Sequence, residues 1–169
     1  MLLKGKRISS EINLREPKLI ERTNRKVAVV SAKGDYSKID YSSLWSKLWP
    51  FIKENKLFNM RMEFLGVYLS DPTSTPREEC LFDACITITR DAPETDEVKI
   101  KEIEGGRYLK FLYIGSYNDF NKVYDIIYNE YLKDKSYKFR NAPWLEKYLN
   151  NPSNTPEHKL KTEVYIPIE

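Results

Sequence analysis

A single glutamate stands between aromatic residues in the run Trp144-Leu145-Glu146-Lys147-Tyr148. Side chains alternate between the two faces of a β-strand, so a strand here places Glu146 on the same face as Trp144 and Tyr148. Aromatic rings offer apolar area and π-faces, and the carboxylate adds a negative charge, so this face has the composition of a receptor for an organic cation. The alternative is that Glu146 is a solvated residue on an exposed strand.

A second pair of the same kind stands near the end of the chain. Glu163 and Tyr165 lie two residues apart in an alternating run and therefore face opposite to Val164. The first half of the chain has an aspartate, Asp83, at the equivalent place, so this pair is less specific than the one at Glu146.

Tryptophan and tyrosine residues supply the other candidates. Trp45 and Trp49 lie one helical turn apart, which is typical of core packing or of a cavity wall. Further tyrosines, such as Tyr108 and Tyr117, could donate hydrogen bonds to a ligand or fill a core with the hydroxyl at its edge. The predicted ligand-binding residues are Glu146, Tyr148, Trp144, Glu163, Tyr165, Tyr68, Trp45 and Trp49.

The sequence lacks the residues needed for a metal site or for a catalytic triad. The chain has one histidine, His158, and two cysteines, Cys80 and Cys85, which are not spaced as a CxxC pair. We therefore expect no metal site and no cofactor. His158 follows Pro156 in a polar loop, so a catalytic triad cannot be assembled from it.

The elements that must position these residues occur in an internal repeat. The run Tyr68–Pro76 returns 80 residues later as Tyr148–Pro156, with five of nine positions identical. The repeat predicts two copies, of about residues 10–90 and 91–169, within a single domain of residues 8–169.

The repeat also allows the two copies to be compared position by position. Where the copies agree, the residue serves the fold, and where they differ, function is a reason for the difference. Gly66 of the first copy aligns with Glu146 of the second. This change from glycine to a carboxylate favours a functional role for Glu146.

Each copy predicts the same order of elements. Apolar runs that end at glycine predict a strand, and an apolar period of three to four residues predicts helices near 41–55 and 118–132. Pro50 lies inside the first helical pattern and is expected to kink that helix or to end its first half. The predicted fold class is α+β, with tandem duplicated strand-helix-strand-strand units, pseudo-two-fold symmetry, a mostly antiparallel sheet and two main helices.

Length and composition are those of one globular domain. The chain has 169 residues, of which 41% are hydrophobic and 31% charged, and a net charge of +3. No run approaches the ~20 apolar residues of a membrane helix, and the first residues have no export signal, which predicts a cytoplasmic protein without membrane contact. Residues 1–26 carry eight Lys or Arg against three Glu. A solvated strand end explains them more simply than nucleic acid does, so no direct DNA binding is expected.

A series of short motifs runs in order along almost the whole chain. They are Gly34-x-Tyr36, Pro72–Pro76 with Arg77-Glu78-Glu79, Phe82–Cys85, Gly105-Gly106-x-Tyr108, Gly115–Tyr117, Trp144–Tyr148 and Thr162–Ile168. In this order and spacing they resemble the GyrI-like small-molecule-binding family, which also provides the effector-binding domain of AraC-type and MerR-type regulators. The resemblance implies a stand-alone domain with a cavity between the copies for amphipathic, often cationic, aromatic compounds. It also implies that Glu146 corresponds to the family's acidic residue, and that Glu163 and Tyr165 correspond to its closing Glu-x-Tyr-x-Pro.

Three functions follow from the residues and the resemblance. We expect the binding of amphipathic, cationic or aromatic small molecules, in multidrug or toxin sensing or sequestration. An alternative is a hydrolase of electrophilic cyclopropane-type toxins, with Glu146 as general base and Tyr108 or Tyr165 as acid. A further alternative is a DNA gyrase inhibitor that acts by protein contact. The expected partners are therefore a small-molecule ligand and either gyrase or a separate regulator, and the sequence leaves open whether the chain is an enzyme.

Overall fold

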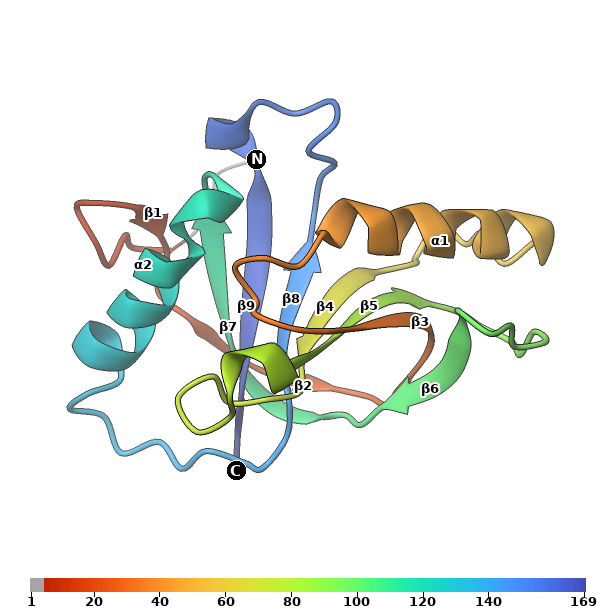
Figure 1. Cartoon of the computed structure of the whole chain (residues 1–169). Coiled ribbons are helices and arrows are strands. Elements are labelled where there is room, and N and C mark those ends of the chain that lie inside the picture. The colour runs from red at the N-terminus through yellow and green to blue at the C-terminus, as the bar shows by residue number, and fades with distance from the viewer. Residues whose placement is uncertain (1–4) are drawn as a thin grey trace. The chain divides into compact units, whose positions relative to one another are not determined.

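The order strand, helix, strand, strand occurs twice in the computed structural model, which describes residues 5–169. In the first half it comprises β3 (Arg25–Lys33), α1 (Tyr41–Glu54), β4 (Phe64–Tyr68) and β5 (Leu81–Thr87). In the second half it comprises β7 (Gly106–Ile114), α2 (Phe120–Asp125), β8 (Trp144–Tyr148) and β9 (Lys161–Ile168). The other strands are β1 (Asn13–Leu14), β2 (Lys18–Arg22) and β6 (Lys99–Ile103), and the short helical turns are η1 (Arg77–Glu79), η2 (Tyr117–Asp119), η3 (Ile126–Tyr131) and η4 (Glu157–Lys159). The predicted α+β class with antiparallel pairing and two main helices is confirmed (Figure 1).

The chain divides into two compact units. Unit 1 comprises the described residues up to Arg22 together with Gly106–Ala142 and Glu146–Glu169, and unit 2 comprises Thr23–Gly105 and Pro143–Leu145. The first strands are exchanged relative to the sequence repeats, because β2 pairs with β7 in unit 1 and β6 pairs with β3 in unit 2. The predicted repeats of about 10–90 and 91–169 therefore stay a prediction.

Unit 2 packs α1 on a sheet of order β4-β5-β3-β6. The side chains of Leu44, Leu48 and Ile52 recur at helical spacing and are buried in one cluster with Phe82 and Ile86 of the sheet. The Asp40 side chain caps α1 by accepting a hydrogen bond from Ser43 N at 3.3 Å.

Pro50 does not end this helix. It lies inside α1, which continues to Glu54. Phe51 and Ile52, on the far side of the proline, are buried against the sheet, and this packing outweighs the backbone hydrogen bond that proline cannot donate.

Unit 1 has strands β1 and β2 on one side of β7, followed by β9 and β8. One face of this sheet, here the helix face, carries Phe111 and Tyr113, whose rings lie 5.5 Å from Tyr131 and 5.6 Å from Phe120 respectively. The predicted helix near 118–132 is helical in the structure, as η2, α2 and the π-helical η3 in succession. Among residues 5–169, no helix combines the length and the apolar content needed to cross a membrane.

The two repeated loops have the same local hydrogen bonds. Asp71 Oδ1 accepts from the backbone N and side-chain hydroxyl of Thr73 at 2.8 and 2.6 Å, and Asn151 Oδ1 accepts from the same two groups of Ser153 at 2.9 and 2.8 Å. Each loop leads into a short helical turn and then a long strand. This shared turn chemistry supports the predicted duplication.

Candidate functional site

Glu146 lies on β8 and is fully buried, with an exposed fraction of 0%. Its two carboxylate oxygens accept hydrogen bonds from two tyrosines: the Tyr124 hydroxyl donates to Oε2 at 2.5 Å and the Tyr148 hydroxyl donates to Oε1 at 2.8 Å. Tyr124 comes from α2 and Tyr148 from β8, so the helix and the strand together hold the carboxylate. The sequence alternative of a solvated Glu146 is therefore wrong.

Aromatic rings line the surroundings of this carboxylate. The ring of Tyr117 lies 5.8 Å from that of Tyr148 and stacks on Phe120 at 5.5 Å. Phe120 in turn lies 6.4 Å from Tyr124. We call Glu146 with Tyr117, Phe120, Tyr124 and Tyr148 the Glu146 cluster.

Burial and the carboxylate keep two tyrosines of the cluster, Tyr117 and Tyr148, protonated. Burial, followed by the negative charge of Glu146, raises the pKa of Tyr117 to about 12. The same two causes, in the same order, raise the pKa of Tyr148 well above its ordinary value. Tyr148 therefore remains a hydrogen-bond donor to Glu146 throughout the neutral range.

The turn after β7 fixes the start of the helical segment that carries these rings. A Cβ atom at Gly115 would lie 2.5 Å from the Tyr113 hydroxyl oxygen, so this position requires glycine. The Tyr113 hydroxyl donates to Ser116 O at 2.7 Å, and Ser116 Oγ accepts from Asn118 N at 3.1 Å. These contacts set the direction in which Tyr117 and Phe120 leave the turn.

Glu163 has a different environment from Glu146. It accepts a hydrogen bond from the Tyr165 hydroxyl at 2.9 Å and forms ion pairs with Lys110 Nζ at 3.1 Å and Lys147 Nζ at 3.9 Å. Lys147 and Glu146 are neighbours on β8 and so point to opposite faces of the sheet. The structure therefore places Glu163 and Glu146 on opposite faces, and the lysines already compensate the charge of Glu163.

The two tyrosines expected to act as acids also lie on the face of Glu163. Tyr108 and Tyr165 make an edge-to-face contact with ring centroids 6.0 Å apart. The guanidinium of Arg140 lies 4.9 Å from the Tyr108 ring centre, and that of Arg22 lies 4.8 Å from the Tyr165 ring centre. The structure thus does not bring Glu146 together with Tyr108 or Tyr165, because the intervening sheet separates them.

The remaining predicted residues are best described within their own elements. Trp45 and Trp49 of α1 lie 6.2 and 6.3 Å from the ring of Phe64, and Trp49 is 45% exposed. Tyr68 makes edge contacts with Tyr36 and Phe82, both at 5.0 Å, in unit 2. Trp144 is half-buried and shares a strand face with Glu146.

The sequence pattern does not place Tyr124 and Phe120 beside Glu146. Both fit the apolar period that predicts the helix near 118–132, and this period is typical of residues that pack in a core. The available signal was the hydroxyl of Tyr124, because a tyrosine within a buried stripe usually finds a hydrogen-bond partner.

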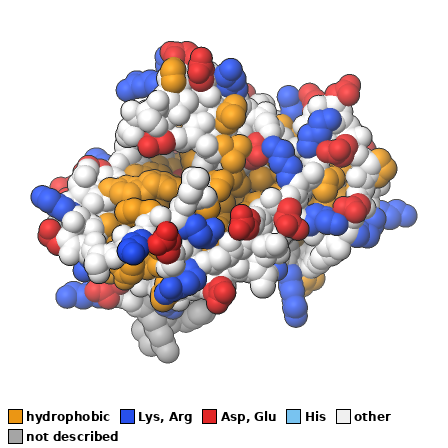
Figure 2. Space-filling view, turned by 90° about the horizontal axis from the view of Figure 1, so that it is seen from below, with side chains coloured by type: hydrophobic (Ala, Val, Ile, Leu, Met, Phe, Trp, Pro, Cys, Tyr) orange, Lys and Arg blue, Asp and Glu red, His pale blue; other side chains and the backbone are white. Residues whose placement is uncertain are grey.

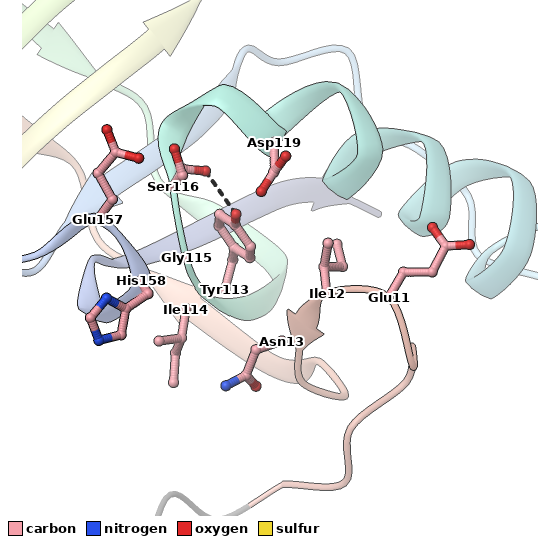
Figure 3. A pocket seen from close by; sticks show the side chains of 10 residues that line it. All are labelled: Glu11, Ile12, Asn13, Tyr113, Ile114, Gly115, Ser116, Asp119, Glu157 and His158. Atoms are coloured by element: carbon pink, nitrogen blue, oxygen red, sulfur yellow. Dashed lines mark hydrogen bonds between the residues drawn. The ribbon is translucent and has the colours of Figure 1, made fainter.

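An open hollow of about 430 Å³ lies in unit 1 beside the turn that follows β7 (Figure 3). None of the predicted site residues lines it. The hollow is lined by Glu11, Ile12, Asn13, Tyr113, Ile114, Gly115, Ser116, Asp119, Glu157 and His158.

Among residues 5–169, no group of three or more His, Cys, Asp or Glu side chains could hold a metal ion.

Sequence comparison relates the chain to a known family. The model of the GyrI-like small molecule binding domain matches residues 15–169. The probable transcriptional regulator YgiV of Escherichia coli (strain K12) is 32% identical over 104 residues, which cover 61% of this chain and 65% of that protein. A DNA gyrase inhibitor of Erwinia billingiae is 30% identical over 113 residues, which cover 65% of this chain and 72% of that protein. The match thus spans just under two thirds of the length of YgiV.

Solved structures show the same fold. The EcmrR C-terminal domain has a TM-score of 0.71 and 15% identity, and the match covers 91% of this chain and 97% of that one. SAV2435 bound to tetraphenylphosphonium has a TM-score of 0.65 and 14% identity, with 91% and 94% covered. At these identities the likeness concerns the fold.

Proposed function

The chain belongs to the GyrI-like small molecule binding domain family, and we propose that it binds amphipathic aromatic cations through the Glu146 cluster, with Glu146 recognising the positive charge. The observation that supports this proposal is the complete burial of the Glu146 carboxylate among tyrosine hydroxyls and aromatic rings. The predicted cavity between the repeats and the cytoplasmic location stay predictions.

Energetics support a functional reason for this carboxylate. Removing an ionised carboxylate from water costs several kcal/mol. Hydrogen bonds to a charged group return about 1.5–3 kcal/mol each, so Tyr124 and Tyr148 offset part of that cost and hold the group in a fixed orientation. The first half of the chain has Gly66 at the aligned position and folds without a carboxylate there.

The rings define the class of ligand. A cation is attracted to an aromatic face when it lies within about 6 Å of the ring centre, most strongly when it is desolvated. A bulky organic cation is weakly hydrated, so its dehydration on entering such a site costs little free energy. A compact ammonium ion is strongly hydrated, so its dehydration costs more. The cluster therefore suits a lipophilic cation with aromatic groups, and tetraphenylphosphonium is a suitable probe because a protein of similar fold is known bound to it.

The test is a calorimetric titration of the full chain with tetraphenylphosphonium. We expect Glu146→Gln to weaken binding about tenfold or more, since charge-assisted contacts contribute about 1.5–3 kcal/mol. The matched control is Glu130→Gln, which removes one negative charge from an exposed position of unit 1 and should bind as the parent does. Equal affinity of Glu146→Gln and the parent, or no binding by the parent, would overturn the proposal.

Hydrolysis is the second candidate function. The short Tyr124 to Glu146 hydrogen bond is the observation that favours it, because it places a hydroxyl donor beside a carboxylate: Glu146 as general base would take a proton from water, and the tyrosine hydroxyl would donate one to the leaving group. The assay follows turnover of a cyclopropane-bearing electrophile by mass spectrometry. Turnover that is lost in Glu146→Gln supports this function, whereas turnover that survives the change excludes Glu146 as the base.

Gyrase inhibition is the third candidate, and it is supported by the name of a relative. A supercoiling assay with purified gyrase and a molar excess of this chain tests it directly. Unchanged supercoiling rules it out.

A further inference from the structure

A basic and aromatic segment connects η3 to β8 in unit 1. Residues 133–140 contain four Lys or Arg and one acidic residue, Asp134. Every residue from Lys133 to Phe139 is exposed. The segment is the light-blue loop at the lower edge of Figure 1. Figure 2, seen from below, shows hydrophobic side chains at the surface of this side of the molecule, with Lys, Arg, Asp and Glu side chains around them.

Backbone hydrogen bonds hold this segment against the end of β9. Arg140 N donates to Pro167 O at 3.2 Å, and Glu169 N donates to Lys138 O at 2.9 Å. Phe139 forms an antiparallel bridge with Ile168. The backbone from Lys138 to Arg140 is therefore fixed, and it presents its side chains in a defined arrangement.

Two aromatic rings of the segment remain accessible. Phe139 is 50% exposed and Tyr137 is 39% exposed. The Phe139 ring lies 6.0 Å from that of Tyr128, which supports it from one side. A supported ring with an accessible face is the arrangement on which a nucleobase stacks.

Cationic residues stand on both sides of these rings in the sequence. Lys133 and Lys138 form no ion pair within the part of the chain that the structure describes, and the ammonium group of Lys135 lies 4.7 Å from the Tyr131 ring centre. Arg107 extends the basic surface, because Arg140 Nη2 donates to Arg107 O at 3.3 Å. Arg107 itself is exposed and donates to Glu169 O at 3.0 Å.

We propose that residues 133–140 bind single-stranded nucleic acid, with Lys133 and Lys138 contacting phosphates and Tyr137 and Phe139 stacking on bases. Cations alone would suit any polyanion, but exposed rings between them favour a polyanion with its own π-faces. A duplex keeps its bases stacked inside, so its bases are not available to these rings. The expectation of no direct DNA binding rests on residues 1–26, which do not include this segment.

The test measures fluorescence anisotropy of a labelled oligothymidylate of about 20 nucleotides against salt concentration, with the full chain. We expect Lys133→Ala/Lys138→Ala to bind more weakly and to reduce the slope of log affinity against log salt by about 1.4, at about 0.7 per phosphate of a single strand. Tyr137→Ala/Phe139→Ala should lose at least about fivefold in affinity, the lower range for stacking of one base. The matched control, Lys53→Ala/Lys56→Ala, removes two exposed lysines of unit 2 and should bind as the parent does.

The following results would contradict the proposal. If the parent shows no salt-dependent binding, the chain has no such site. If the Lys53→Ala/Lys56→Ala control loses as much affinity as Lys133→Ala/Lys138→Ala, the site does not lie in residues 133–140. Equal affinity for a duplex of the same length removes the preference for single strands. Inorganic polyphosphate that competes equally per phosphate, together with unchanged binding by the Tyr137→Ala/Phe139→Ala variant, would show a surface that recognises charge alone. Circular dichroism of each variant serves as the control for folding, and we expect the spectrum of the parent because the substituted side chains are exposed.

Discussion

Glu146 and Glu163 show how two glutamates on neighbouring strands acquire different chemistry. Lys110 and Lys147 compensate the charge of Glu163, while tyrosine hydroxyls contact both oxygens of Glu146. Hydroxyl donors stabilise a carboxylate without neutralising its charge. This difference in partners is the reason why the proposed function assigns recognition of the cation to Glu146 and not to Glu163.

Removal of one of these hydroxyls has a measurable cost at this scale. Tyr124→Phe removes the hydroxyl that donates a hydrogen bond to Oε2 of the buried Glu146 carboxylate. We expect the free energy of unfolding to fall by about 1–3 kcal/mol, as measured by denaturant titration. In the Glu146→Gln background the same change should cost less, because the charge is gone. Equal costs in the two backgrounds would show that Tyr124 does not act through Glu146.

The ionisation of Tyr117 provides a pH prediction. Its pKa of about 12 lies above the ordinary 10.0, so the unfolded chain loses this proton first as the pH rises. The contribution of Tyr117 to stability is thus complete below about pH 10 and falls as the pH rises toward 12. Absorbance titration of tyrosinate should show a late-ionising step that becomes smaller by one tyrosine in Tyr117→Phe, while Tyr113 remains, because burial raises its pKa to about 12 as well. In Glu146→Gln the ionisation of Tyr117 should occur at lower pH, because the negative charge that helps to raise its pKa is gone. An unchanged ionisation would show that the charge of Glu146 does not act on Tyr117.

The turn that ends β7 determines where the helical segment of the cluster begins. Gly115 has a φ of +156°, and its partner in sequence, Gly34 at the end of β3, has a φ of +150°. The two positions differ in their neighbours, since a Cβ at Gly34 meets nothing within 4 Å whereas one at Gly115 meets the Tyr113 hydroxyl. A side chain would therefore strain the backbone at both glycines, but it would clash with a neighbouring side chain only at Gly115, beside the Glu146 cluster.

This difference allows a paired test of the element. Both Gly115→Ala and Gly34→Ala should lower the free energy of unfolding by about 1–3 kcal/mol through backbone strain. Gly115→Ala should cost more, because the Tyr113 hydroxyl must move away from Ser116 O. Parallel denaturant titrations of the two variants measure the difference. A larger loss in Gly34→Ala would contradict the role assigned to the Tyr113 contact.

The sequence predicted these elements better than it predicted their contacts. The apolar period identified both helices, because burial of one helix face is a local pattern. It did not identify the Tyr124 to Glu146 contact, which joins α2 to β8 across 22 residues and depends on how the helix packs on the sheet. The sequence also grouped Glu163 with Glu146 in one candidate site. Alternation within a strand shows which of its own residues share a face, but it does not show which face of the neighbouring strand lies on the same side of the sheet. Only the pairing of strands shows that the two faces differ.

At the scale of the whole molecule, the motifs predicted the family, and the match over residues 15–169 confirms it. The division into units could not be predicted from the repeat. β2 pairs with β7, and β6 pairs with β3, so each unit contains the first strand of the other sequence copy. Sequence similarity shows which segments are alike, but it does not show which strand pairs with which, because β2 and β6 each pair with a strand of the other copy.

The most direct test of the central claim compares two ligands in the full chain. Tetraphenylphosphonium and neutral triphenylphosphine oxide are both rich in phenyl rings but differ in charge. We predict that the parent prefers the cation, and that Glu146→Gln lowers the ratio of the two affinities about tenfold or more, through loss of binding to the cation alone. An affinity ratio that stays unchanged in Glu146→Gln would contradict the claim that this carboxylate recognises the charge of the ligand.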